Sequence, residues 1–413
     1  MKPKLNNLVK WLYPGIGVKR WVGLSALGVI LLVIGERNLH LEGYWLIKIL
    51  DSIVVISGII ILILGIKMML RSFIAAFSPS SRDTEIVDIL YQKKHLSRGP
   101  KIVTIGGGTG LAVLLSGLKE YTSNITAVVT VADDGGSSGR LRQEFDILPP
   151  GDIRNCLVAL ADAPALMRDL FQFRFDTNSE LSGHSFGNLF ITVMTRLTGD
   201  FEKAIKETSK VLALKGRVIP ATLNNVVLEA RYKDGSVVTG ENMIPKTKLP
   251  IEKVSLKPAQ SQATPDAVKA IQEAQIIVLG PGSLYTSVIP NLLIKEISDA
   301  VVASSAIKVY VCNAMTQPGE TDGYSASDHI KALVNHSHPR VLDYCIVNIG
   351  EIPQEILQRY ARENSYLVIN DRKKIENFGY RVIEDDFAVI EKEVIRHDPS
   401  RLARIILGLT EEI

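Results

Sequence analysis

The sequence predicts an α/β fold in which helices cover a parallel sheet that carries a small β insertion and follows an apolar helical hairpin. Three observations support this prediction. A short apolar run, 101–105, ends in a glycine-rich turn, 106–110, and opens an amphipathic stretch at 111–121. Further β-branched runs end in polar or glycine-rich clusters. Two uncharged apolar segments lie within residues 1–70.

Composition excludes several classes of function. The chain has 413 residues, 46% of them hydrophobic, which is enough for a sizeable core. Of its 47 Lys and Arg and 44 Asp and Glu, residues 1–100 hold thirteen and six, leaving 34 against 38 in the remainder. The acidic remainder argues against nucleic-acid binding. Cys156, Cys312 and Cys345 lack metal-type spacing, so no zinc, Fe–S cluster or disulfide framework is expected.

The apolar segments predict a membrane hairpin over residues 1–77, with helices at about 21–36 and 45–70. Each uncharged core, 21–35 and 52–66, has fifteen residues, short of the roughly 20 that span hydrocarbon. Extending the second core back to residue 45 reaches that length but includes Lys48 and Asp51 near the membrane boundary. A buried hairpin in a soluble domain is the alternative. A signal peptide is disfavoured, because no small-residue cleavage site follows the first segment.

Basic residues predict the orientation of this hairpin. Arg37 alone lies in the loop between the segments, whereas the others flank them at Lys2, Lys4, Lys10, Lys19, Arg20, Lys67, Arg71, Arg82, Lys93, Lys94 and Arg98. By the positive-inside rule, both termini and the main domain are expected in the cytoplasm, with the hairpin as a multi-pass anchor in the cell membrane. The polar stretch 78–100 is the expected linker, and 101–413 the main domain.

Further strands are expected in order along the main domain, at 125–132, 275–279, 308–312 and 343–348. Each is short, rich in β-branched residues and bounded by glycine, asparagine or acidic residues. Alternating strands and helices predict a parallel sheet. Residues 217–254, rich in Val and Thr, are instead interpreted as a small β-hairpin insertion. Ligands of such sheets bind beyond the carboxyl ends of strands, where the polar clusters fall.

The glycine turn after the first strand predicts phosphate binding, because it exposes backbone N–H groups at a helix N-terminus. Leu111 replaces the third glycine of a dinucleotide fingerprint, and no Gly-Lys-Ser/Thr follows, so neither an NAD fold nor a P-loop NTPase is indicated. A purely structural turn is the alternative. The candidate phosphate ligands here are Gly107, Gly108, Thr109 and Gly110.

The cluster at 133–142 predicts a metal and phosphate site. Asp133 and Asp134 follow a strand, and two adjacent carboxylates suit Mg²⁺ or a ribose hydroxyl. Asp134 is also a catalytic candidate. A loop of donors follows them, namely Ser137, Ser138 and Arg140, with Arg142 beyond. The alternative is a solvated loop whose polar residues cap a helix.

Two later clusters open predicted helices. In 149–155, Arg154 and Asn155 fall in a first helical turn, where an anion would offset the unfavourable positive charge. Asp152 is either a ligand or only the helix N-cap. In 182–188, His184, Ser185 and Asn188 precede an apolar helix, and His184 is a candidate general acid or base as well as a structural hydrogen-bonding group.

The remaining candidates come from the second half of the chain. The run 280–287 repeats the strand–glycine–helix arrangement and contributes Gly282 and Ser283. Asn313 follows the next strand, ahead of the loop 315–322. Tyr360 is placed to stack on a base or sugar, and Arg396 adds a cation beside a histidine. The last two signals are weaker and, taken alone, are more typical of surface residues.

Six segments together resemble the bacterial gluconeogenesis factor family, which is YvcK-type and CofD-like. They are IGGGTGLAVLLSGLK, TVADDGGSSGRLR, LPPGDIRNCLVALAD, LSGHSFGNLF, VLGPGSLYTS and YVCNAMTQPGETDGYSASDH, in order between about residues 101 and 401. Relatives include 2-phospho-L-lactate transferase, which moves a phospholactyl group from a nucleotide diphosphate to a deazaflavin precursor with Mg²⁺. The resemblance implies a three-layer Rossmann-like, nucleotide-binding domain over 101–413.

The resemblance also implies roles for particular residues. Phosphate and nucleotide contacts are implied at Gly107, Gly108, Thr109, Asp133, Asp134, Asn188, Gly282 and Ser283, and sugar-nucleotide contacts at Tyr360 and Arg396. The implied ligand is a UDP-sugar, notably UDP-N-acetylglucosamine. The implied role is control of carbon flow to cell-wall precursors and cell shape during growth on gluconeogenic carbon sources. The hundred residues before the glycine turn depart from the usual family member.

Two functions stay open. In the first, the protein is a regulator that binds a UDP-sugar, over which residues 135–142 become ordered and alter a face that binds a partner protein. In the second, it is a Mg²⁺-dependent transferase in which Asp133 and Asp134 hold the metal and the acceptor enters beside His184. The DDGGSSGR segment favours the regulator. A homo-oligomer and an unidentified regulatory protein partner are also expected.

Overall fold

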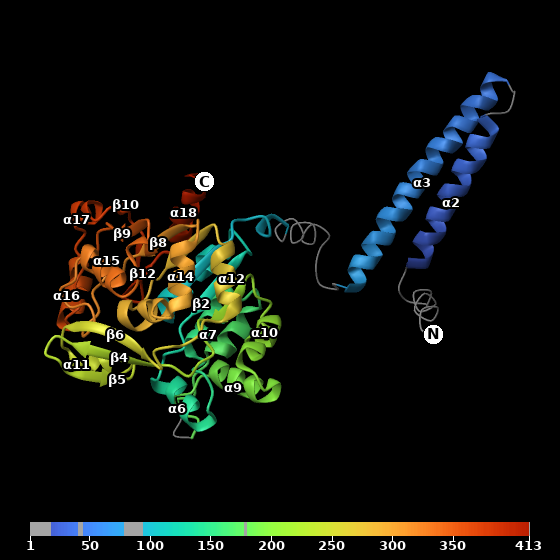
Figure 1. Cartoon of the computed structure of the whole chain (residues 1–413). Helices are drawn as coiled ribbons and strands as arrows, with labels where there is room; N and C mark the ends of the chain where they lie inside the picture. The colour runs from blue at the N-terminus through green and yellow to red at the C-terminus, as the bar shows by residue number, and fades with distance from the viewer. Residues whose placement is uncertain (1–17, 40–43, 78–93, 177–179, 413) are drawn as a thin grey trace. The chain divides into compact units, whose positions relative to one another are not determined.

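The computed structural model describes residues 18–39, 44–77, 94–176 and 180–412, which divide between two units, Met1–Lys93 and Lys94–Ile413. Figure 1 shows a helical hairpin in the first unit and an α/β fold in the second. Most of the expected linker, at 78–93, lies outside the described residues. Its last residues, 94–100, belong to the second unit.

The hairpin consists of α2 (Val18–Leu39) and α3 (Trp45–Phe77). The two helices pack closely at glycine residues. A Cβ on Gly28 would lie 2.7 Å from the Leu62 amide nitrogen and 3.0 Å from the Gly58 carbonyl oxygen, so these backbones touch directly. Arg20–Leu39 and Trp45–Met69, with mean hydropathies of 1.6 and 2.8, are long and apolar enough to cross a membrane. Signal sequences and core helices of soluble proteins share those properties.

The second unit is built on a seven-stranded sheet in which every adjacent pair is parallel. In spatial order its strands are β10 (Arg381–Asp385), β9 (Tyr344–Asn348), β8 (Ile307–Val311), β7 (Ile276–Leu279), β1 (Ile102–Gly106), β2 (Ile125–Val129) and β3 (Arg217–Pro220). The chain winds outward from β1 to β3 and then from β7 to β10. The winding therefore reverses between β1 and β7, which is where open α/β sheets bind ligands.

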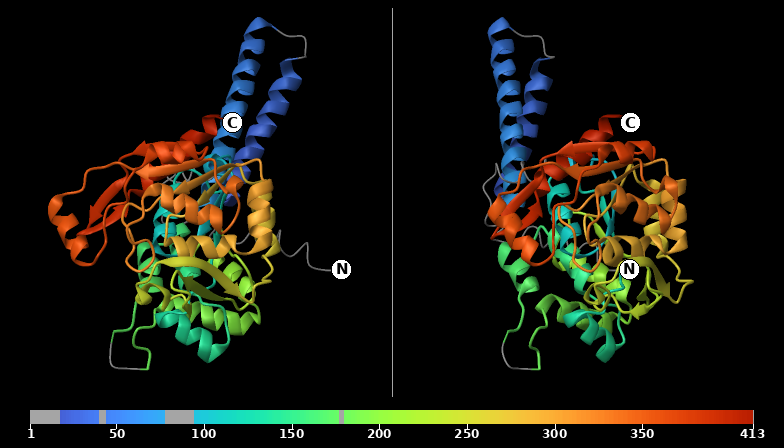
Figure 2. Two further views of the ribbon diagram at one scale, coloured as in Figure 1. Left: turned by 60° about the vertical axis from the view of Figure 1, so that its left-hand side comes forward. Right: turned by 90° about the vertical axis from the view of Figure 1, so that its left-hand side faces the viewer.

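Helices cover both faces of this sheet, which confirms the predicted fold class (Figures 1 and 2). They are α5 (Gly108–Leu118), α6 (Gly136–Phe145), α7 (Gly151–Leu160), α8 (Ala165–Gln172), α9 (Phe186–Thr198), α10 (Phe201–Val211), α12 (Pro265–Glu273), α13 (Ile289–Leu292), α14 (Lys295–Ala303), α15 (Ala326–Asn335), α16 (Gln354–Arg362), α17 (Arg372–Asn377) and α18 (Pro399–Gly408). Short turns are η1 (Leu284–Val288), η2 (Pro339–Val341) and η3 (Leu409–Glu412). The central strands β1, β2 and β7 are wholly buried, so the core forms around them.

The β insertion differs from its predicted bounds of 217–254. It is a three-stranded antiparallel sheet, in the order β5 (Val237–Thr239), β4 (Val227–Tyr232) and β6 (Ile251–Lys257), with α11 (Ile244–Thr247) in one connection. The prediction was wrong for β3, which pairs in parallel with β2 in the main sheet. A four-residue β-branched run fits either sheet locally, and pairing with a strand ninety residues away decides which one it joins.

A second departure lies near the C-terminus, where β11 (Ala388–Glu391) and β12 (Val394–His397) form an antiparallel hairpin separate from the main sheet. No strand was predicted there. The hairpin presents the Arg396 region to the ligand-binding edge described next.

Candidate functional site

The glycine turns after β1 and β7 lie against each other at the switch point. Gly108 adopts a φ of +69°, a conformation that residues with a side chain rarely adopt. A Cβ on Gly110 would lie 2.9 Å from the Pro281 carbonyl oxygen and 3.1 Å from Gly282 Cα. The two turns therefore pack backbone to backbone, and only glycine leaves room for this contact.

A cavity of about 560 Å³ opens beside these turns. It is lined by Gly107, Gly108, Thr109, Gly110, Gly282, Ser283, Asn313, Tyr360 and Arg396 among the predicted site residues. Residues that were not proposed as ligands also line it, including Thr316, Gln317, Glu363, Ser365, Val394, Ile395 and His397. Residues from the beginning and the end of the α/β unit thus line one cavity together with two glycine turns. This arrangement suits a phosphorylated ligand.

Side-chain amides fix the second glycine turn. Asn313 Nδ2 donates to the Gly282 carbonyl at 2.8 Å, and its Oδ1 accepts from the Gly282 N–H at 3.3 Å. Gln317 Nε2 donates to Ser283 Oγ at 2.7 Å. Gln317 was missed by the sequence reading, although it lies in the recognised MTQPGETD segment. Both amides hold Ser283 and the turn in one position before any ligand binds.

Tyr360, a candidate from the sequence, holds the wall of the cavity that the C-terminal residues 394–397 form. Tyr360, on α16, accepts a hydrogen bond from the Ile395 N–H at 2.9 Å through its phenol oxygen. This bond ties α16 to β12 and so sets the place of Arg396. No residue of α16 is buried, so this helix borders the cavity without being part of the core.

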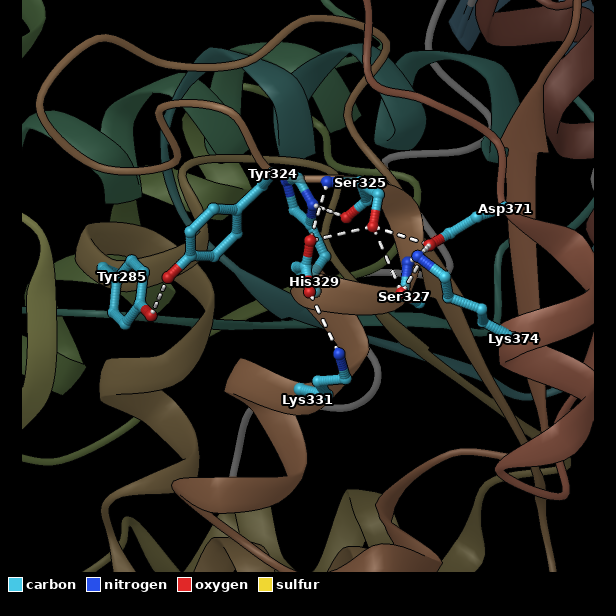
Figure 3. Close-up of polar contacts among 9 residues, drawn as sticks. Tyr285, Tyr324, Ser325, Ser327, His329, Lys331, Asp371 and Lys374 are labelled. Atoms are coloured by element: carbon cyan, nitrogen blue, oxygen red, sulfur yellow. Dashed lines mark hydrogen bonds and ion pairs between the residues drawn. The ribbon is translucent and has the colours of Figure 1, made fainter.

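The loop between β8 and α15 closes one side of the cavity. This loop is anchored by the carboxylate of Asp371, which lies outside the cavity. Asp371 accepts hydrogen bonds from Ser325 Oγ at 2.8 Å and from Ser327 Oγ at 2.6 Å (Figure 3). Burial opposes ionisation of Asp371, but the bonds from Ser327 and Ser325 outweigh it and lower the pKa to about 2. Figure 3 also shows the Tyr285–Tyr324 hydroxyl pair at 2.7 Å. This network supports the wall and contributes no group to the cavity.

His397, in the cavity wall, carries no acidic proton to donate at neutral pH. His397 packs against the Phe387 ring with centroids 5.2 Å apart. Burial lowers the pKa of His397 to about 4, so the ring is neutral at physiological pH. A neutral ring donates or accepts hydrogen bonds but does not supply a proton at pH 7. His397 is therefore not a proton donor in the cavity at neutral pH.

The other predicted residues form a second group that does not line the cavity. It consists of Asp133, Asp134, Ser137, Ser138, Arg140, Arg154, Asn155, His184, Ser185 and Asn188. Residues 136–145, expected partly as a loop, form helix α6, so the segment proposed to order over the ligand is already helical. Ser185 is the buried N-cap of α9, and its hydroxyl accepts from the Asn188 N–H. Arg154 donates to Asn155 Oδ1 at 2.7 Å.

Within this second group, His184 is paired with a serine. Ser137 Oγ lies 2.9 Å from His184 Nδ1 and accepts from Asn188 Nδ2 at 3.0 Å. The Ser137 hydroxyl therefore links His184, in the loop before α9, to Asn188 in the first turn of that helix. Burial, followed by the charge of Arg140, lowers the pKa of His184. This shift favours the neutral form of the ring.

Carboxylates lie between the cavity and this second group. Asp152 is not the N-cap of α7, a position that Pro150 occupies. It accepts instead from the Gly108 N–H, and a Cβ on Gly107 would lie 2.4 Å from its Oδ2. Burial, then repulsion from Asp133, raises the pKa of Asp152 to about 7. Burial and Asp133 likewise raise the pKa of Glu241 to about 8.

Glu241 was not predicted, because it comes from the insertion and no motif marks it. Burial also raises the pKa of Asp133 itself. One oxygen of Asp133 accepts from the Gly135 N–H, and one of Asp134 from the Asn242 N–H, both at 2.9 Å. Asp133 accepts from the Ser138 side chain as well. Burial is the first cause of the raised pKa values of Asp133, Asp152 and Glu241, and repulsion among the acids adds to it.

The fit of this cluster to Mg²⁺ is partial. Among the described residues, no group of three or more His, Cys, Asp or Glu side chains is arranged to hold a metal ion. Mg²⁺ is commonly held by one or two carboxylates together with water and substrate phosphates. Asp133 and Asp134 meet that need when a diphosphate is present. They do not form a preassembled metal site.

Comparison with known proteins adds to this geometry. The family profile of 2-phospho-L-lactate transferase CofD matches residues 102–388. The gluconeogenesis factor of Bacillus subtilis is 49% identical over 317 residues, which cover 77% of this chain and 100% of its own. A Nostoc sp. protein provisionally named a gluconeogenesis factor is 46% identical over 424 residues, covering 98% of this chain and 93% of its own. That similarity extends into the first hundred residues.

A solved structure is similar to the second unit. The crystal structure of a Bacillus halodurans protein superposes with a TM-score of 0.74 at 48% sequence identity. It covers 75% of this chain and 100% of the Bacillus halodurans chain. The α/β unit therefore corresponds to the whole of that crystallised chain.

Proposed function

This chain belongs to the CofD family and to its gluconeogenesis-factor branch, and from that premise we propose that it is a regulator that binds a UDP-sugar. UDP-N-acetylglucosamine is the ligand we expect. The regulated process would be carbon flow to cell-wall precursors and cell shape during growth on gluconeogenic carbon sources. The observation that carries the proposal is the 560 Å³ cavity, in which two glycine turns meet Asn313, Tyr360 and Arg396.

The chemistry of the cavity supports a nucleotide diphosphate ligand. The N–H groups of Thr109 and Gly110, in the first turn of α5, would face a pyrophosphate in the cavity. Those of Gly108 and Gly282 instead donate to Asp152 and Asn313. Ser283 and Thr109 add hydroxyl donors. Arg396 adds a guanidinium, and Tyr360 a ring for a base or sugar. The neutral ring of His397 supplies no proton for acid catalysis there at neutral pH.

Titration calorimetry of Lys94–Ile413 with UDP-N-acetylglucosamine tests this proposal. Arg396→Gln should weaken binding about 10-fold or more, because a charge-assisted hydrogen bond contributes roughly 1.5–3 kcal/mol. Arg404→Gln, on the exposed face of α18, removes the same charge outside the cavity and should bind like the parent. No detectable binding of the nucleotide sugar, with Mg²⁺ present, would exclude the regulator.

A Mg²⁺-dependent transferase is the second candidate, and the carboxylates around Asp133 favour it. Mg²⁺ bound there would neutralise charge on a donor diphosphate. Asp133 and Asp134 would hold it, while Arg154 would stabilise charge that develops on the phosphate. Incubation with guanylyl phospholactate and the deazaflavin acceptor tests this candidate directly. Failure to form product, under conditions where an authentic transferase works, would reject it.

The apolar hairpin supports a membrane anchor for this protein. Both helices have the length and hydropathy to cross a bilayer, and basic residues flank them in the sequence. We expect the α/β unit on the cytoplasmic side, and binding partners there to include a regulatory protein and a second copy of the chain. Fractionation of cells checks the anchor. Full-length protein found wholly in the soluble fraction would contradict it.

A further inference from the structure

Three arginines converge on the loop 182–188, outside the nucleotide cavity. Arg140 Nη2 donates to the Ser182 carbonyl at 2.6 Å, and Arg174 Nη1 donates to the Gly183 carbonyl. Arg154 packs against the same loop, because a Cβ on Gly187 would lie 2.8 Å from its Cδ. Arg140 and Arg154 come from α6 and α7, and Arg174 follows α8, so three separate segments bring positive charge to one loop.

These guanidinium groups lack close acidic partners. Within the described parts of the chain, no carboxylate oxygen lies within 4.0 Å of Arg140, Arg154 or Arg174. The charges of Asp152 and Asp133 act on Arg154, and the charge of Glu144 acts on His184. Arg140 and Arg174 are exposed and use only part of their five donors each. These two guanidinium groups therefore carry positive charge that no carboxylate of the described residues pairs with at close range.

Two buried polar atoms at the loop have no hydrogen-bond partner. Arg154 is 8% exposed, and its Nε donor is unpaired. Asn188 is 2% exposed, and its Oδ1 acceptor is unpaired. Both lie at the first turn of α9, whose N-terminus adds a partial positive charge. A buried donor or acceptor without a partner destabilises the fold, so a ligand that pairs with these atoms would be favoured.

We propose that the loop 182–188, with Arg140, Arg154 and Arg174, is a second ligand site that takes the phosphoryl group of a small molecule other than the nucleotide in the cavity. The phosphoryl oxygens would accept from the arginines and from Arg154 Nε. A hydroxyl on the phosphate, or one next to it on the ligand, would donate to Asn188 Oδ1. Asp152, between the loop and Gly107, separates this site from the cavity.

The competing explanation is that Arg140 and Arg174 only brace the loop through its carbonyls. That role needs hydrogen bonds but no excess of charge, and it leaves Arg154 Nε unexplained. The two explanations differ in whether the loop responds to an anion. The proposed site does not depend on the identity of the nucleotide bound in the cavity.

A phosphate titration tests the proposal. Inorganic phosphate is added to the full-length protein in detergent, and binding is followed by ³¹P NMR while chloride keeps the ionic strength constant. Phosphate should bind with and without saturating UDP, and Arg174→Gln and Arg140→Gln should each weaken it about tenfold. Arg168→Gln, an exposed change on α8, should bind phosphate like the parent. Arg396→Gln, in the cavity, should keep the phosphate binding that Arg140→Gln and Arg174→Gln weaken.

Other results would overturn the proposal. Absence of phosphate binding, or normal binding by both Arg174→Gln and Arg140→Gln, would leave bracing as the role of these arginines. Loss of phosphate binding in Arg396→Gln, or displacement of phosphate by UDP, would place the anion in the cavity. Failure of UDP-N-acetylglucosamine to bind is a separate outcome, because the comparison of Arg174→Gln with Arg396→Gln needs no nucleotide.

Discussion

Replacement of Asp152 by Asn should stabilise the α/β unit at pH 8 and change its stability little at pH 4. The carboxyl group of Asp152 is enclosed, and burial with repulsion from Asp133 raises its pKa from 3.8 to about 7. The native state therefore holds a proton on Asp152 at pH values where the unfolded chain has lost it. An acid of this kind lowers the free energy of unfolding as pH rises from about 4 to about 7.

The magnitude follows from the shift in pKa. A rise from 3.8 to about 7 corresponds to a ceiling of about 4 kcal/mol at about 1.36 kcal/mol for each pKa unit. Asp133 titrates together with Asp152, and Asp152 as a whole residue is only partly buried, so solvent screening lowers the expected effect to about 2 kcal/mol at pH 8. Asparagine keeps an oxygen to accept from the Gly108 N–H and removes only the charge.

Urea unfolding of Lys94–Ile413 at pH 4 and pH 8, in buffer free of divalent cations, measures this effect. Asp169→Asn, which neutralises an exposed acid on α8, is the matched control and should give the same small change at both pH values. An Asp152→Asn effect that does not depend on pH, or a loss of stability at pH 8, would refute the assignment of Asp152 as a destabilising buried charge.

Three further changes test other contacts. Gly110→Ala should reduce the free energy of unfolding by about 1–3 kcal/mol by forcing the two glycine turns apart, whereas Gly106→Ala, whose Cβ would be 3.7 Å from its nearest atoms, should cost less in the same denaturation assay. Tyr360→Phe should cost about 1 kcal/mol, because the Ile395 N–H loses its acceptor, and calorimetry should show weaker nucleotide binding. Mg²⁺ should raise the melting temperature more at pH 8 than at pH 5, because more of the clustered acids are ionised at pH 8. Glu241→Gln should reduce that difference, because it removes an acid whose pKa is raised to about 8.

The sequence predicted the parts of the site that depend on local chain geometry. A glycine run after a short apolar strand specifies a turn that other residues cannot adopt, so Gly107, Gly108 and Gly282 were identified without coordinates. The resemblance of long motifs added Tyr360 and Arg396, and both line the cavity. Hydropathy alone identified the helical hairpin, because burial in lipid or in protein demands a long apolar run.

Interactions between distant segments could not be predicted in the same way. Glu241 approaches Asp133 only because the insertion folds back on the turn before α6, and no local pattern records that approach. Gln317 reaches Ser283 between the loops that follow the neighbouring strands β8 and β7, and β3 joined the main sheet through a partner far away in the sequence. These contacts depend on sheet order and register, which many sequences of the same local character could satisfy differently.

By itself the sequence determined the parallel α/β fold, the glycine turns and the family. Only the tertiary structure decided how the polar residues are divided: the glycine turns, Asn313 and Arg396 share one cavity, while His184 and Arg154 lie in a separate group beyond Asp152. The physical reason is that a helix N-terminus or a turn fixes which groups are presented, whereas the packing of α6, α7 and α9 fixes the side to which they point.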